Sequence, residues 1–166
     1  LWFVKITGWL PALFYFRKKV IYVGEKKIKF KGKMMLISNH KALMDYPLYM
    51  YTFLGKSIRT LTAEVIYNKG KLMAWFLEKI GCIRVDRDTY NFNFLEKTID
   101  ILNNDGTVLM FPESKLPKDE HIQDFKPSFV YIALESKSPI LPMYTNGKYG
   151  KKERARVIIG DPIYLH

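Results

Sequence analysis

A histidine and an aspartate stand five residues apart, directly after a short apolar run. The run is MMLIS at residues 34–38, and it is followed by Asn39, His40 and, further on, Asp45. If the run is a buried strand and Asp45 opens a helix, the carboxylate can turn back toward the imidazole. It would then hold one tautomer of the ring while the other ring nitrogen accepts a proton. The spacing therefore predicts a general base.

The chemistry open to such a base depends on whether the chain also supplies a nucleophile. No G-x-S-x-G turn of the kind that presents a reactive serine occurs in the sequence. A His/Asp base alone suits the activation of a substrate hydroxyl for attack on an already reactive acyl group, such as a thioester. For an isolated His-x4-Asp pattern, coincidence or a helix cap is the simpler interpretation, so the pair needs support from the rest of the chain.

A second polar segment follows another apolar run. After TVLMF at residues 107–111 come Pro112, Glu113, Ser114 and Lys115. Active groups of open α/β sheets lie in loops beyond the carboxyl ends of the strands. We therefore expect this segment to lie at the same edge of the sheet as His40.

Five short motifs in the sequence occur in order over about residues 35–163. They are NH-x4-D at 39–45, GCIRVDR at 81–87, FPE at 111–113, PILP at 139–142 and IGDPI at 159–163. Their order and spacing resemble those of the glycerolipid acyltransferases, the 1-acylglycerol-3-phosphate acyltransferase-like (PlsC-type) family. Each motif is weak alone, but five in register are specific.

The resemblance implies the transfer of a fatty acyl group from acyl-CoA or acyl carrier protein to the hydroxyl of a lysophospholipid, with a 1-acylglycerol-3-phosphate-like acceptor, in phospholipid biosynthesis or remodelling. It implies that His40 is the general base and Asp45 its orienting partner. Arg87 would hold the acceptor's phosphate, Glu113 would help to shape the acceptor site, and Pro142 would support that loop. The acyl donor is a co-substrate, and no cofactor or metal is expected.

Several of these residues also have simpler interpretations. Arg87 could pair with neighbouring acidic residues at the surface, where an ion pair contributes little. Cys82 is expected to be a buried strand residue and not a nucleophile; as the single cysteine, it excludes an intramolecular disulfide. Pro139 and Pro142 could simply mark the edge of a strand.

The third motif departs from the family pattern. Phe-Pro-Glu is usually followed by Gly-Thr-Arg, whereas this chain has Ser114, Lys115 and Leu116. The glycine allows a tight backbone and the arginine contributes to phosphate recognition, which a leucine cannot do. Lys115, Lys118 or Lys126 could supply a point charge instead, without the bidentate geometry of arginine. We therefore place Lys115 with Arg87 and Glu113 as candidate acceptor- or phosphate-binding residues, and the acceptor's headgroup stays open.

The elements that must position these residues follow from the hydrophobic pattern. Short apolar runs alternate with segments of helical period, which predicts a single α/β domain with a mostly parallel central sheet flanked by helices. Strands are expected at 20–23, 28–30, 34–38, 57–63, 82–86, 107–111, 139–144 and 155–160. The first two would form a hairpin. Helices are expected at 46–54, before Gly81, along 92–102 and at 127–136.

The charge of the chain is concentrated in two segments. The formal net charge is +11, of which residues 1–33 carry +8 and residues 146–156 carry +4, so the remainder is close to neutral. A basic chain suggests an acidic partner: nucleic acid, an anionic membrane or a phosphorylated substrate. We divide the chain into an N-terminal apolar helix and basic segment at 1–33 and an acyltransferase domain at 34–166.

The basic N-terminal segment adjoins an apolar stripe at helical spacing. The stripe consists of Trp2, Ile6, Trp9, Leu13 and Phe16. It predicts an N-terminal amphipathic apolar helix that contacts an anionic membrane surface, since the run is shorter than the roughly 20 residues of a membrane span. The alternative is an amphipathic helix packed on its own domain.

Three functions are compatible with these features. The leading one is a lysophospholipid acyltransferase associated with the cytoplasmic face of a membrane, peripherally or by an N-terminal anchor. The alternative is a catalytically weak lipid-binding or interaction protein on the same scaffold, which the altered third motif favours. Nucleic-acid binding ranks last, because no zinc finger, GXXG loop or RNP pattern is present. We therefore expect no nucleic-acid partner.

Overall fold

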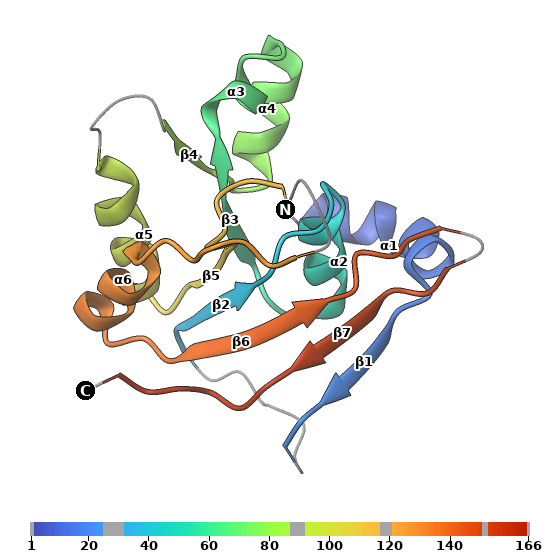
Figure 1. Ribbon diagram of the computed structural model, residues 1–166. Coiled ribbons are helices and arrows are strands. Elements are labelled where there is room, and N and C mark those ends of the chain that lie inside the picture. The colour runs from blue at the N-terminus through green and yellow to red at the C-terminus, as the bar shows by residue number, and fades with distance from the viewer. Residues whose placement is uncertain (1, 25–31, 87–91, 117–120, 151–152, 166) are drawn as a thin grey trace.

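The computed structural model describes residues 2–24, 32–86, 92–116, 121–150 and 153–165 (Figure 1). The helices in these ranges are α1 (Trp2–Phe16), α2 (Asp45–Thr52), α3 (Glu64–Tyr67), α4 (Lys71–Lys79), α5 (Asn93–Asn103) and α6 (Ser128–Ser136). The strands are β1 (Lys19–Tyr22), β2 (Met34–Ser38), β3 (Ile58–Ala63), β4 (Ile83–Val85), β5 (Thr107–Met110), β6 (Ile140–Thr145) and β7 (Arg156–Ile159).

One sheet contains all of these strands, in the order β1-β7-β6-β2-β5-β3-β4. Every neighbouring pair is parallel except β6 with β7. Each residue of the central strands β2 and β5 is buried, as expected for a sheet covered on both faces. The prediction of a single α/β domain with a mostly parallel sheet is therefore confirmed.

Alternate side chains of β2 enter two different cores. Met34 and Leu36 pack with α1 and α2, whereas Met35 and Ile37 pack with α5 and α6. Figure 1 shows the same division, with α1 and α2 on one side of the sheet and α5 and α6 on the other. Because successive side chains of a strand point to opposite faces, the position of a residue in β2 decides which helical layer its side chain contacts.

The predicted end of the helix before Gly81 is confirmed, together with its capping chemistry. Gly81 has φ +82°, a conformation that glycine adopts without steric cost. Its N–H donates to the carbonyl of Glu78 at 3.0 Å, and the N–H of Cys82 donates to Leu77 at 2.9 Å. These two bonds form a Schellman cap. They turn the chain from the buried Cys82 into β4.

Two local details differ from the sequence-based predictions. Helix α2 begins at Asp45 itself, and its N-cap residue is Met44, because the Asp45 carboxylate is engaged with the preceding loop. Helix α3 was not predicted, since its sequence EVIY is short and rich in residues that also suit a strand. Strand β1 pairs in parallel with β7. The second strand of the expected hairpin, at 28–30, lies outside the described residues.

The N-terminal segment is attached to the domain at several points. The buried Lys5 side chain donates to the carbonyls of Phe53 at 3.1 Å and Leu54 at 3.2 Å, and also to that of Lys56, just beyond the end of α2. The Tyr51 hydroxyl donates to the carbonyl of Val4 at 2.8 Å. One side of α1 thus packs on the domain, and β1, which precedes residue 33, is an edge strand of the same sheet.

The predicted apolar stripe of α1 is divided between two environments. Phe16 is buried, whereas four members of the stripe are exposed: Trp2, Ile6, Trp9 and Leu13. Within the described ranges, no helix is both long enough and apolar enough to cross a membrane.

Candidate active site

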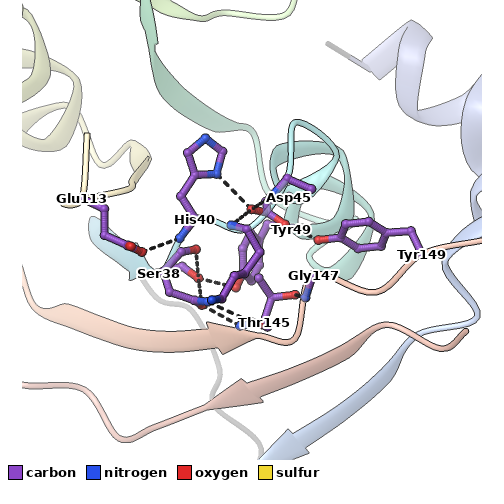
Figure 2. Close-up of polar contacts among 11 residues, drawn as sticks. Ser38, His40, Asp45, Tyr49, Glu113, Thr145, Gly147 and Tyr149 are labelled. Carbon is purple, nitrogen blue, oxygen red and sulfur yellow. Dashed lines mark hydrogen bonds and ion pairs between the residues drawn. The ribbon is translucent and has the colours of Figure 1, made fainter. Parts of the chain in front are cut away.

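The candidate site lies where several strands end on the same edge of the sheet (Figure 2). His40 follows β2, Glu113 follows β5, and Tyr149 belongs to the loop after β6. Asp45 opens α2, which begins a few residues after β2. The parallel arrangement of β2, β5 and β6 brings segments that are more than 100 residues apart in the sequence to one place.

The structure brings His40 and Asp45 into direct contact. The Nδ1 atom of His40 is 2.9 Å from Oδ2 of Asp45, and the Asp45 side chain is completely buried. The same oxygen accepts the backbone N–H groups of Lys41 at 2.7 Å and Ala42 at 2.8 Å. Because this oxygen already accepts backbone N–H groups, it also acts as an acceptor toward Nδ1 of His40. The network therefore assigns the proton to Nδ1 and leaves the lone pair on Nε2.

A second contact fixes the plane of the His40 ring. The imidazole stacks on the Phe111 ring, with a centroid separation of 4.2 Å and an interplanar angle of 16°. The His40 side chain keeps 19% of its surface exposed. The ring is thus held from one side and along one edge, while part of it stays accessible to a substrate.

Glu113 holds the backbone at His40. It is buried, and its Oε1 accepts the N–H of His40 at 2.7 Å while Oε2 accepts the N–H of Gln123 at 2.8 Å. The sequence led us to expect Glu113 at the acceptor site. In the described structure its carboxylate binds these two backbone amides, which ties the loop after β2 to the segment after β5.

Asn39 fastens the same loop from the other side. Its amide nitrogen donates to the Thr145 carbonyl at 2.9 Å, and its Oδ1 accepts the Thr145 N–H at 2.8 Å. This two-point contact resembles one rung of a sheet and extends the pairing of β2 with β6 beyond the strand end. The asparagine of the first motif therefore sets where His40 leaves the sheet.

Tyr149 completes the surroundings of Asp45, and sequence reasoning missed it. Its hydroxyl donates to Oδ1 of Asp45, the oxygen that faces away from His40 (Figure 2). Burial raises the pKa of the Tyr149 hydroxyl, and the charge of Asp45 raises it further, so the group stays protonated and acts as a donor. The only sequence signal was its place in the basic 146–156 segment, which carries no motif for a site.

A cavity of about 860 Å³ opens beside His40. Its apolar lining includes residues of strands β3, β4 and β5 and of the start of α5: Leu61, Ala63, Val85, Met110, Phe92 and Phe94. Lys115 and Lys126 also line it, together with Asp86. Glu113 is not one of the described residues that line the cavity. The described lining of the cavity thus combines an apolar wall, two lysines, an aspartate and the candidate base.

The backbone of the third motif keeps the conformation that suits a glycine. Ser114 has φ +63°, in the left-handed region that side chains other than glycine adopt at a cost. Its N–H donates to the Phe111 carbonyl at 2.9 Å, which closes a tight turn. Serine therefore occupies a turn whose backbone conformation glycine adopts more easily.

The remaining predicted residues are placed as follows. Lys115 is exposed on the cavity wall, and Leu116, at the position of the family's arginine, is exposed outside it. Arg87 and Lys118 lie outside the described residues. Burial raises the pKa of the Cys82 thiol, which disfavours the reactive thiolate. Cys82 is buried, as expected, but it lies directly before β4 and not within the strand.

Comparison with known protein families decides the family of the chain. Residues 19–146, a span that runs from β1 to just past the end of β6, match the family model described as Acyltransferase. The chain belongs to the acyltransferase family. The match includes His40, Asp45 and Glu113, but ends before Tyr149.

Similar proteins are known from several organisms. This acyltransferase-family chain is 29% identical over 140 residues to a probable 1-acyl-sn-glycerol-3-phosphate acyltransferase of Mycoplasma genitalium, covering 81% of this chain and 52% of the relative. It is 25% identical over 142 residues to the 1-acyl-sn-glycerol-3-phosphate acyltransferase of Borreliella burgdorferi, covering 84% and 54%. The chain therefore spans about half the length of these relatives.

A solved structure supports the fold independently. The 1-acyl-sn-glycerophosphate (LPA) acyltransferase PlsC of Thermotoga maritima superimposes with a TM-score of 0.66 and 21% sequence identity. The superposition covers 89% of this chain and 62% of the other. At this identity the likeness concerns the fold.

Proposed function

We propose that this chain catalyses transfer of a fatty acyl group from a thioester donor to the hydroxyl of a lysophospholipid of the 1-acylglycerol-3-phosphate kind. The observation that carries the proposal is the contact between His40 and a buried Asp45 beside an apolar-lined cavity. Membership of the acyltransferase family and the names of the relatives support the same reaction class. The donor is acyl-CoA or acyl carrier protein.

In the proposed mechanism, His40 acts through its Nε2 atom. That nitrogen takes the proton of the acceptor hydroxyl while the oxygen attacks the thioester carbonyl, and Asp45 stabilises the resulting imidazolium. The tetrahedral intermediate then collapses, the carbon–sulfur bond breaks, and the imidazolium returns the proton to the leaving thiolate. The products are an ester and a free thiol, and the base is regenerated.

The cavity has the composition that both substrates need. The apolar residues of β3, β4 and β5 suit a fatty acyl chain, whose burial releases about 0.8 kcal/mol per methylene. Lys115 and Lys126 supply positive charge for a phosphate group, and Arg87 is proposed to contribute a further cation. Glu113 is proposed to act on the acceptor site indirectly, by fixing the backbone at His40.

We propose that the exposed face of α1 contacts an anionic membrane surface. Aromatic and apolar side chains at Trp2, Phe3, Ile6 and Trp9 are exposed on it, and the sequence is strongly basic just beyond the helix. This combination is typical of helices that lie in the interface of a bilayer. It would place the cavity close to its lipid substrates, on the cytoplasmic face.

The test is a panel of donors and acceptors on the purified chain with detection of free thiol. Acyl-CoA and acyl carrier protein thioesters are each combined with lysophosphatidate, lysophosphatidylglycerol and lysophosphatidylcholine in anionic vesicles, with His40→Ala as the blank. Thiol release that needs both a lysolipid and His40 supports the proposal. Vesicle or lysolipid binding without thiol release in any combination would favour a lipid-binding protein on the same scaffold.

A further inference from the structure

The outer oxygen of Asp45 has its own donor. His40, Lys41 and Ala42 all contact Oδ2, whereas the Tyr149 hydroxyl contacts Oδ1. Because the carboxylate is completely buried, an oxygen that loses its donor has no solvent to replace it. The orientation of Asp45, and through it that of the imidazole, therefore depends on Tyr149.

Tyr149 is held in place by the end of the N-terminal helix. Its ring stacks on Tyr15, with centroids 6.5 Å apart and an interplanar angle of 18°. It also makes an edge-to-face contact with Phe16, with centroids 5.6 Å apart and an interplanar angle of 85°. The next residue, Gly150, donates its N–H to the Tyr15 carbonyl at 3.1 Å. A continuous set of contacts thus runs from α1 through Tyr149 to Asp45.

We propose that Tyr149 is a positioning residue for the acyl-transfer reaction, acting on His40 through Asp45 and held by the last turn of α1. The proposal rests on the function proposed above. Its ring sets the place of the hydroxyl, and the hydroxyl holds the carboxylate in the orientation that keeps the Nδ1 proton on the imidazole. The N-terminal helix is by this route a structural part of the active site.

The test compares two tyrosine-to-phenylalanine variants. Tyr149→Phe keeps the ring packing and removes the donor to Asp45. Tyr51→Phe keeps the ring contact with Phe16 and removes the donor to Val4, near the other end of α1 from Tyr15. We expect Tyr149→Phe to lower kcat about tenfold with KM changed less than twofold, the effect of one hydrogen bond to a charged group. Tyr51→Phe should lower thermal stability to a similar extent and leave kcat within twofold of the parent.

A pH profile separates positioning from a loss of stability. The titratable groups that face Asp45 are His40 after β2, Tyr49 of α2 and Tyr149 after β6. Without the Tyr149 hydroxyl, the carboxylate attracts a proton more strongly and also holds the imidazolium more strongly. The acid limb of the kcat profile should therefore move to higher pH in Tyr149→Phe and stay unchanged in Tyr51→Phe.

The outcomes distinguish this inference from the proposed function. If the parent chain releases thiol and His40→Ala does not, the function stands. Wild-type kcat in Tyr149→Phe, an equal loss of kcat in both phenylalanine variants, or an unmoved acid limb would then overturn the role of Tyr149 alone. If the parent chain and His40→Ala are equally inactive, the proposed function itself has failed.

Discussion

At the scale of single residues, the site depends on two buried carboxylates that accept backbone amides. Asp45 accepts the N–H groups of Lys41 and Ala42, and Glu113 accepts those of His40 and Gln123. A buried charge is tolerated where hydrogen bonds replace its hydration. Both carboxylates therefore stabilise the loop that presents His40. The geometry of the candidate site and the stability of this loop thus depend on the same two residues.

Glu113→Gln tests the structural use of the second carboxylate. A glutamine has one acceptor oxygen, so one of the two amide donors would face an NH₂ group. We expect a loss of about 1–3 kcal/mol in the free energy of unfolding and a lower kcat, measured by urea denaturation and thiol release. Glu135→Gln, on the exposed side of α6, is the matched control. Equal stability of the two variants would contradict this account of Glu113.

Ser114→Gly tests the strained turn of the third motif. The φ of +63° at Ser114 costs a serine more than it costs a glycine. We expect the substitution to raise the free energy of unfolding by about 1 kcal/mol, net of the greater freedom of glycine in the unfolded chain. Ser57→Gly, at an exposed position outside the positive-φ region, should instead be neutral or destabilising. A destabilised Ser114→Gly would argue against strain at this turn.

Sequence reasoning reached the residues that carry a motif and missed the one that does not. His40, Asp45 and Glu113 follow apolar runs, so their meeting at one sheet edge could be predicted from strand order alone. Tyr149 contacts Asp45 across 104 positions of sequence, from a loop without regular structure. No local pattern records such a contact, because it depends on how β6 and α1 end in space.

At the scale of elements, the period of the hydrophobic pattern was the most reliable guide. All strands that were expected within the described residues are present, because each is a short apolar run bounded by turns. Helix α3 was missed because four residues are too few to show a helical period. How α1 packs was left open, because its sequence is apolar on more than one side. The structure shows both a packed and an exposed side.

The titration of Lys5 tests whether α1 packs against the rest of the domain. Burial lowers its pKa to about 8, whereas an unfolded lysine titrates near 10.5. Between these values the unfolded chain binds the extra proton, so stability should rise with pH. Relative to Lys5→Met, the unfolding free energy of the parent should increase by about 2–3 kcal/mol from pH 7 to pH 10.5.

The control for that prediction is an exposed lysine. Lys71→Met, in α4, should follow the parent's pH dependence because its side chain is exposed. Urea denaturation of the three proteins at each pH gives the difference directly. A parallel pH dependence of the parent and Lys5→Met would mean that Lys5 titrates normally and is not buried against α2.

At the scale of the whole molecule, the residues of the candidate site lie at one edge of the sheet, and α1 packs beside them. The basic segments at 1–33 and 146–156 are far apart in sequence, yet β1 pairs with β7, and Tyr149 of the second segment packs on α1. The family match begins at β1, after α1. The contacts with Tyr149 nevertheless join α1 to the site.

The measurement that tests the account most directly is lysolipid-dependent thiol release by His40→Ala. Its control is His121→Ala, an exposed histidine that matches no motif. If His40 is the general base, its loss should reduce the rate at least about 100-fold with the unfolding transition unchanged, while His121→Ala stays close to the parent. Thiol release by His40→Ala at the parent's rate would contradict the central claim.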